Sequence, residues 1–95
     1  MNHELKVKWT ARFKKEYKLC AKRGLDITKL DNVIRLIANR EILPEMFKDH
    51  ALTGNWAGYR ECHINTDWLL VYMIGEDILV LTLTRTGTHS DLFKL

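Results

Sequence analysis

The sequence predicts one α+β domain, residues 1–95, with elements in the order β-α-α-β-β-β. Three observations carry this prediction. An alternating segment opens the chain, two segments with helical spacing of apolar residues follow, and the last third holds three strand-like segments joined by short turns. Because 95 residues are too few for two cores, we expect a small, mainly antiparallel sheet with both helices packed on one face.

The first three elements follow from local patterns. The segment "ELKVKW" (residues 4–9) alternates as a strand does, with one face formed by Leu5, Val7 and Trp9, but its orientation in the sheet does not follow from its sequence. Thr10 is the expected N-cap of a helix that ends at Gly24 and has the apolar stripe Phe13, Tyr17, Cys20 and Ala21. Thr28 and Asp31 suggest a capping box for a second helix, which should end near Arg40. The second stripe consists of Leu30, Val33, Ile34 and Ile37.

A turn-rich loop leads to three strands. These are "YRECHI" (59–64), "DWLLVYMI" (67–74) and "ILVLTLT" (78–84), with turn signals at residues 65–66 and 75–77. Connections this short predict an antiparallel meander, which brings residues about 20 apart in sequence to one end of the sheet. We therefore expect His63 and Asp67 to lie beside the segment "RTGTHSDLF" that follows the last strand.

Composition excludes several classes of protein. The chain is 46% hydrophobic and 28% charged, which suits a folded domain. No apolar run approaches the roughly 18 residues of a membrane helix, and "MNHELKVKWT" lacks the apolar core of a signal peptide. We therefore expect a cytoplasmic protein that makes no contact with a membrane. Cys20 and Cys62 should be free thiols. Their spacing gives no zinc motif, and a disulfide is not expected in the cytoplasm.

Positive charge is concentrated in the first half. Residues 1–48 carry 12 Lys/Arg and 6 Asp/Glu, whereas residues 49–95 carry 3 and 6, which together give the net charge of +3. Most of the excess lies in residues 6–23, outside the apolar stripe of the first helix, where it would attract phosphates. The residues concerned are Lys14, Lys15, Lys18, Lys22 and Arg23. A merely solvated helix face is an equally good interpretation of this segment alone.

The polar residues expected at the sheet end suit cleavage of RNA. The 2′-hydroxyl of RNA is its own nucleophile, so the reaction needs a base, an acid and a cation near the phosphate. Histidine can fill either proton-transfer role near neutral pH, and arginine offers a planar fork to phosphate oxygens. An aromatic side chain such as Phe93 or Trp68 could stack on an unpaired base. The candidates for the chemistry are His50, His63, Asp67, Arg85 and His89.

Other interpretations of the same residues stay open. His63 could be an ordinary strand histidine, Arg85 could pair with Asp91, and Trp68 could belong to the core. A zinc site is disfavoured because the chain has no His-x-His, His-x₃-His or Cys-x₂-Cys spacing. Ser/His/Asp hydrolysis is disfavoured because no nucleophile elbow is present.

Two segments carry a resemblance to a known family. "KDHALTGNWAGYRECHINTDWLLVYMI" and "LTRTGTHSDLF", which lie between Lys48 and Phe93, closely resemble the YafQ-type branch of the RelE/ParE toxin superfamily. The first half of the chain matches only in element order and basic character. The resemblance implies a RelE-like fold and the toxin of a type II toxin–antitoxin system. It further implies an endoribonuclease that cuts mRNA in the ribosomal A site and needs no metal or cofactor.

The resemblance also implies roles for residues. The functional positions of the family fall on His50, His63, Asp67, Trp68, Arg85, His89 and Phe93. Arg85 would contact the scissile phosphate and His89 would be the general acid, while the base is Asp67, His63 or His50. Phe93 and Trp68 would position a base of the codon. The lysines of the first helix and Arg23 would bind ribosomal RNA.

Partners follow from the same resemblance. A cognate antitoxin would wrap and silence the toxin, and the complex would bind its own operator DNA. The alternative is a ParE-like toxin that acts on DNA gyrase by protein binding, without nuclease activity. The sequence does not give the codon preference, the ribosome dependence or the stoichiometry of the complex.

Overall fold

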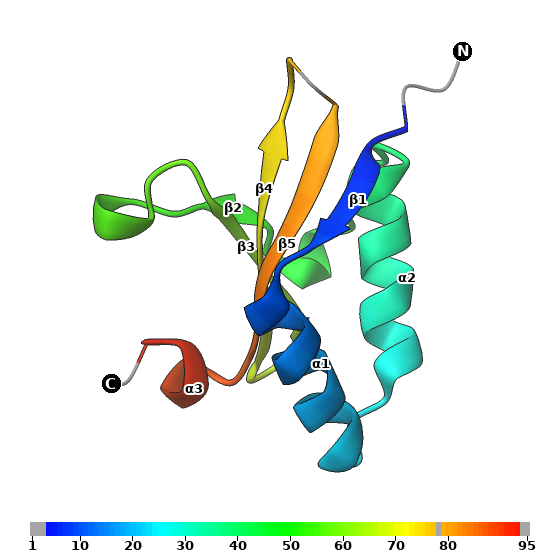
Figure 1. The fold of residues 1–95 in the computed structure, drawn as a ribbon, viewed down its shortest axis with the longest axis vertical. Helices are drawn as coiled ribbons and strands as arrows, with labels where there is room; N and C mark the ends of the chain where they lie inside the picture. Colours follow the sequence, from blue (N-terminus) through cyan, green and yellow to red (C-terminus); the bar gives the residue numbers. More distant parts are fainter. Residues whose placement is uncertain (1–3, 78, 94–95) are drawn as a thin grey trace.

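The computed structural model describes residues 4–77 and 79–93, which form a mixed sheet with two long helices on one side (Figure 1). His3 and Ile78 lie outside the described residues. The elements are β1 (Lys6–Trp9), α1 (Ala11–Lys22), α2 (Ile27–Ala38), η1 (Glu45–Phe47), β2 (His50–Ala51), η2 (Gly54–Trp56), β3 (Arg60–Asn65), β4 (Trp68–Gly75), β5 (Val80–Gly87) and α3 (His89–Phe93). The predicted α+β class is confirmed, and β2, α3 and the two 3₁₀ turns η1 and η2 are additions to it.

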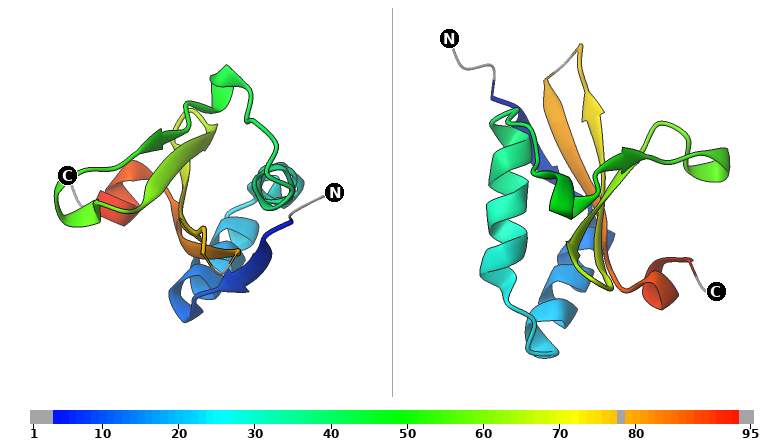
Figure 2. Two further views of the ribbon diagram at one scale, coloured as in Figure 1. Left: turned by 90° about the horizontal axis from the view of Figure 1, so that it is seen from above. Right: turned by 180° about the vertical axis from the view of Figure 1, so that it is seen from behind.

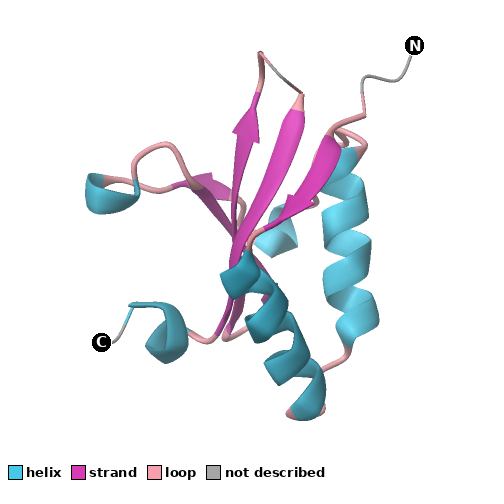
Figure 3. Cartoon of the chain, in the orientation of Figure 1, coloured by secondary structure: helices cyan, strands magenta, loops and turns pink. Residues whose placement is uncertain are grey.

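The sheet has the strand order β1-β5-β4-β3-β2 (Figure 3). Strands β3, β4 and β5 form the predicted antiparallel meander. The first strand, whose orientation the sequence left open, runs parallel to β5, with Lys6 opposite Val80 and Trp9 opposite Leu83. Since β1 ends at Trp9, it covers only the first half of β5, and the second half continues past it toward α3.

One of the two predicted helix caps is correct. Thr10 caps α1, because its Oγ1 accepts a hydrogen bond from the amide of Phe13 at 3.0 Å. The cap of α2 is Asp26 rather than Thr28, since Asp26 Oδ1 accepts from the amide of Thr28 at 3.1 Å. The expected capping box was therefore wrong, and Asp31 instead accepts a hydrogen bond from the hydroxyl of Tyr17 at 2.8 Å, which ties α2 to α1.

The main core lies between the sheet and the two long helices. Apolar side chains of α1 and α2 pack against β3, β4 and β5, as in the predicted layer arrangement. The members that are fully buried include Phe13, Leu30, Val33, Leu70, Leu81 and Leu83. Val7 shares a face with Leu5 but stays 38% exposed, because β1 is an edge strand. Cys20 and Cys62 are free and buried, and burial raises the pKa of both thiols.

A second, smaller cluster covers the other face of the sheet. Leu69 and Val71 of β4 pack there against Leu92 of α3, with the aromatic rings of Trp56, Tyr59 and Phe93 around them. Figure 2 shows α3 and the η2 segment on the side of the sheet that faces away from α1 and α2. Within the described residues, no helix is long and apolar enough to cross a membrane. The polar residues that lie on this second face, beside α3, form the candidate site.

Candidate active site

Strands β2 and β3 and helix α3 bring three of the predicted histidines together. The alternation of β3 places Glu61 and His63 on the same face, and β2 sets His50 directly opposite Glu61. His89 is the first residue of α3. The ring of His63 lies between the other two, with centroid distances of 6.4 Å to His50 and 5.7 Å to His89. The convergence expected from the meander is therefore present in the structure.

Asp67 orients His89. The Nδ1 atom of His89 lies 2.7 Å from Asp67 Oδ1, and the backbone amide of His89 donates to the same oxygen at 3.1 Å. These two hydrogen bonds from His89 lower the pKa of Asp67, so its carboxylate is ionised near neutral pH. An ionised carboxylate at Nδ1 favours the proton on that nitrogen, which directs Nε2 away from the pair. Asp67 fits this orienting role better than that of a general base, which would need a raised pKa.

Glu61 is a member of the cluster that the sequence analysis missed. Its side chain is 7% exposed, and Oε1 lies 3.5 Å from His50 Nε2 and 3.6 Å from His63 Nε2. His50 is also held from its other nitrogen, because Nδ1 lies 2.7 Å from the carbonyl of Lys48 and must donate to it. The signal was present in "YRECHI", where Glu61 and His63 share a face of a mostly buried strand, and a buried carboxylate requires a partner.

The same side chains could also bind a metal ion. One ligand atom each from Glu61, His63 and His89 lies within 4.8 Å of the other two. The spacing rules applied to the sequence did not find this group, because one ligand comes from α3 and two come from β3. Imidazole and carboxylate ligands suit zinc or copper. The expected absence of a metal from the reaction therefore stays a prediction, and removal of metal ions is the experiment that tests it.

Arg85 makes no contact with the cluster of histidines and carboxylates, because it is paired with Glu16 of α1. Its Nε and Nη2 atoms bind the carboxylate of Glu16 at 2.9 and 2.7 Å, and its side chain is only 11% exposed. The pairing with Asp91 that the sequence allowed is limited to a contact between Nη2 and the Asp91 carbonyl at 3.4 Å. The guanidinium thus sits between α1 and α3, and would have to leave Glu16 to bind a phosphate. Glu16 was not a candidate in the sequence analysis.

The two aromatic candidates differ in placement. Trp68 is 2% exposed in the main core, where its Nε1 donates to Thr86 Oγ1 at 2.9 Å. It could stack on a nucleotide only by leaving the core, so its place corrects the expected RNA contact. Phe93 is half-buried on the second face, edge-on to Trp56 with ring centroids 5.9 Å apart. Trp56 in turn packs against Tyr59, with ring centroids 5.3 Å apart. Trp56 and Tyr59 are thus two aromatic rings beside the site to which the sequence analysis assigned no role.

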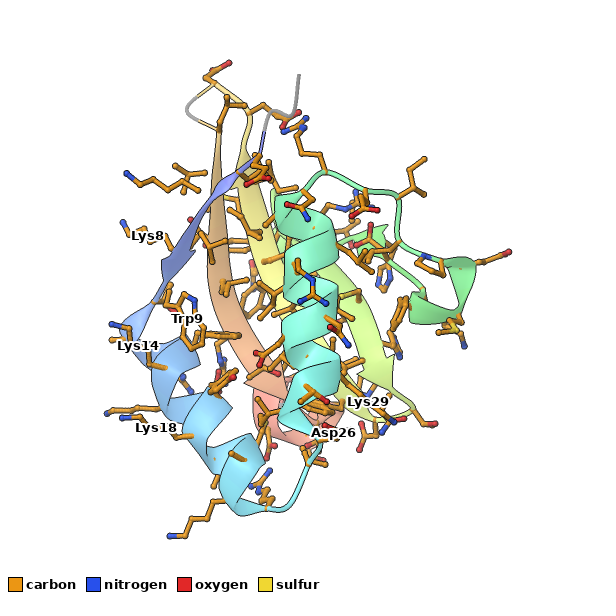
Figure 4. The ribbon with its side chains drawn as sticks, turned by 90° about the vertical axis from the view of Figure 1, so that its right-hand side faces the viewer. Lys8, Trp9, Lys14, Lys18, Asp26 and Lys29 are labelled. Carbon is orange, nitrogen blue, oxygen red and sulfur yellow. The ribbon has the colours of Figure 1, made fainter. Side chains whose placement is uncertain are left out.

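The basic residues of the first helix are exposed. Lys14 and Lys18 project outward from α1 on the side where Lys8 projects from β1 (Figure 4). Lys15 and Lys22 are also exposed, in agreement with their place outside the apolar stripe. Arg23 differs from them, because its Nη1 pairs with Asp91 of α3 at 2.8 Å.

The fold and the site define a class of small α+β protein in which imidazoles and carboxylates gather at one end of a mixed sheet. The sequence profile described as "Bacterial toxin of type II toxin-antitoxin system, YafQ" matches residues 5–94. The chain therefore belongs to the YafQ family of toxins of type II toxin–antitoxin systems.

Individual relatives agree with this assignment. The "mRNA interferase toxin YafQ" of Escherichia coli K12 is 39% identical over 88 residues, which span 92% of this chain and 94% of the relative. The YafQ chain in a crystal structure of the E. coli DinJ–YafQ toxin–antitoxin complex superposes with a TM-score of 0.87 at 37% identity, covering 95% of this chain and 98% of that one. A metal-bound toxin from Helicobacter pylori superposes with a TM-score of 0.88 at 38% identity, covering 94% and 99%.

Proposed function

We propose that the protein is an mRNA interferase, an endoribonuclease that arrests translation by cutting mRNA in the ribosomal A site. The observation that carries the proposal is the array of three imidazoles around Glu61, with His89 oriented by Asp67. Membership of the YafQ family supports it, because the E. coli relative is an mRNA interferase. A cognate antitoxin is the proposed partner, by analogy with DinJ in the E. coli complex, and operator DNA would be bound only through that complex.

The proposed reaction uses the RNA as its own nucleophile. A base removes the proton of the 2′-hydroxyl, and the 2′-oxygen attacks phosphorus. The bond from phosphorus to the 5′-oxygen then breaks, and His89, acting in its doubly protonated form, gives that oxygen the proton on Nε2 and keeps the one on Nδ1. The products are a 2′,3′-cyclic phosphate and a 5′-hydroxyl. His63 is our choice for the base because its ring adjoins that of His89, with the centroids 5.7 Å apart, and His50 is the second candidate.

Mapping of mRNA 5′ ends in cells that express the chain tests the function. Cuts that keep the reading frame on translated messages, each with a 5′-hydroxyl, are the expected result. Intact messages with arrested replication would instead support a gyrase-directed toxin of the ParE type. A message whose start codon has been removed is the control, because A-site cleavage requires that the message be translated.

The exposed lysines of α1 should set the salt dependence of ribosome binding. If they bind phosphates of ribosomal RNA, the double variant Lys14→Gln with Lys18→Gln should bind more weakly, and the slope of log affinity against log salt should flatten by about 0.7–0.9 for each phosphate that is no longer neutralised. The cleavage rate of the bound complex should not change. Lys29→Gln on α2 is the matched control. An unchanged slope in the double variant would mean that these lysines are only a solvated face.

Metal removal should leave the activity unchanged. Because the 2′-hydroxyl supplies the nucleophile and His89 the acid, no step requires an ion. Chelation of zinc, nickel and copper, with magnesium kept for the ribosome, should preserve the cleavage rate, and added zinc should inhibit by occupying Glu61, His63 and His89. Cleavage that is lost on chelation and restored by zinc would contradict the metal-free reaction.

A further inference from the structure

The second half of β5 is covered by side chains of α1 and of its N-cap Thr10. β1 pairs with β5 only from Val80 to Leu83, so beyond Leu83 this edge of β5 faces α1, while the opposite edge still pairs with β4. Thr10 Oγ1 donates to the carbonyl of Thr84 at 3.1 Å, and Glu16 Oε1 accepts from the amide of Thr86 at 3.2 Å. Glu16 thus satisfies a backbone donor of the strand edge, as a paired strand would.

Glu16 also holds Arg85 in a fixed orientation. Both carboxylate oxygens lie 2.9 Å from Arg85 Nε, and one of them lies 2.7 Å from Nη2. The two side chains are only 15% and 11% exposed. A forked contact of this kind between nearly buried partners restricts the direction of the guanidinium, and removing Glu16 leaves the charge of Arg85 uncompensated, whereas Glu16 also lies 3.9 Å from Nε of Arg12.

The guanidinium in turn supports the start of α3. Arg85 Nη2 reaches the carbonyl of Asp91 at 3.4 Å, while the Asp91 carboxylate accepts from the amide of Thr88 at 3.1 Å and pairs with Arg23 at 2.8 Å. The hydrogen bond from Arg23 is the main cause that lowers the pKa of Asp91, so this carboxylate stays ionised. The packing is close, since a Cβ on Gly87 would lie 3.0 Å from Asp91 Oδ2. His89 lies between these anchored residues.

We infer that Glu16 is a positioning residue for RNA cleavage, which acts through Arg85 to fix α3 and so places His89 beside Asp67. The Glu16 carboxylate binds the guanidinium of Arg85 between α1 and α3. Arg85 therefore contributes to the reaction by holding α3 in place and does not bind the scissile phosphate. The inference deepens the proposed function and rests on it for the catalytic readout. Its structural part, the control of His89 by Glu16, is measured separately.

A double-mutant cycle separates this role from a direct phosphate contact. The variants are Glu16→Gln, Arg85→Gln and the two combined, assayed by single-turnover cleavage on programmed ribosomes. We expect each single change to lower the chemical rate by about 10²-fold with little change in substrate affinity, because misplacing a catalytic group costs about that much. The combined variant should lose no more than either single one. Arg40→Gln and Glu76→Gln form the control, because that exposed arginine–glutamate pair also makes two hydrogen bonds but lies far from α3.

The opposite pattern would overturn the inference. If Arg85 binds the phosphate, Glu16→Gln frees it and keeps or raises the rate, while Arg85→Gln alone loses activity. Glu16→Asp keeps the charge and should recover part of the rate, whereas loss of folding would show as a lowered melting temperature in every Glu16 variant. The ¹⁵N shifts of the His89 ring give a readout without RNA. We expect them to change in Glu16→Gln, and unchanged shifts would refute the inference even if the protein cleaves no RNA.

Discussion

Replacement of His89 by alanine will lower RNA cleavage by roughly 10²–10⁴-fold, the range expected when a general acid is removed. The geometry supports this role because Asp67 accepts from Nδ1 at 2.7 Å, so the doubly protonated ring directs its second proton, on Nε2, to the leaving oxygen. The fold should survive the change, since the His89 side chain is 40% exposed and belongs to neither apolar cluster. The rate should be measured under single-turnover conditions on programmed ribosomes.

The choice of leaving group makes this prediction specific. A substrate in which sulfur replaces the bridging 5′-oxygen has a leaving group that needs no proton. The His89→Ala variant should cleave that substrate at nearly the wild-type rate, whereas a variant that lacks the base should remain slow on it. Ser90→Ala is the control, because Ser90 is exposed on the same turn of α3. Equal losses on both substrates would assign His89 a role other than that of the acid.

The sequence predicted those elements whose pattern runs for several residues. The three long strands were recognisable because continuous apolar runs end at short turns, and the orientation of the meander followed from the length of those turns. β2 was missed because two residues carry no periodicity and pair only through their register with Arg60 and Glu61. The cap of α2 was misplaced because Asp26 and Thr28 both have good capping side chains, and only the backbone decides between them.

The site was predictable in part, because only the contacts that depend on neighbouring strands can be inferred from the sequence. His63, Asp67 and His89 are brought together by local strand order, which the sequence reveals. Glu16 and Arg85 are separated by most of the chain, and their pairing depends on α1 lying along the exposed edge of β5. A motif identifies the arginine but not the direction of its side chain. The same limit applies to Trp68, whose place in the core depends on which face of β4 meets the helices.

Combined replacement of His63 and His89 by alanine will abolish growth arrest while the protein still binds its antitoxin. The antitoxin of such a system is expected to be acidic and partly disordered when free, so it should favour a basic helix with exposed apolar residues. α1 carries four exposed lysines together with Leu19, which is 43% exposed. The histidine site lies at the end of the sheet, on the face that packs against α3.

The catalytic rate of this double variant carries a second expectation. If His63 and His89 act as base and acid in one step, the combined loss should be smaller than the product of the two single losses, because neither group works without the other. Growth, co-purification with the antitoxin and cleavage rate should be measured for both single variants and the double. Lys14→Gln with Lys18→Gln is the reciprocal control, which should weaken binding to the antitoxin and leave the chemical step intact.

Each possible outcome assigns the source of toxicity differently. A double variant that stays toxic would show that the histidine cluster does not cause the growth arrest, and a protein-binding toxin would then be favoured. A variant that loses toxicity and antitoxin binding together, with an unchanged melting temperature, would place the antitoxin directly on His63 and His89. Loss of toxicity with binding retained is the expected result, because the basic surface of α1 and the imidazole array are built from different elements. If the antitoxin binds α1 and not the histidines, the double variant can lose RNA cleavage and still bind the antitoxin.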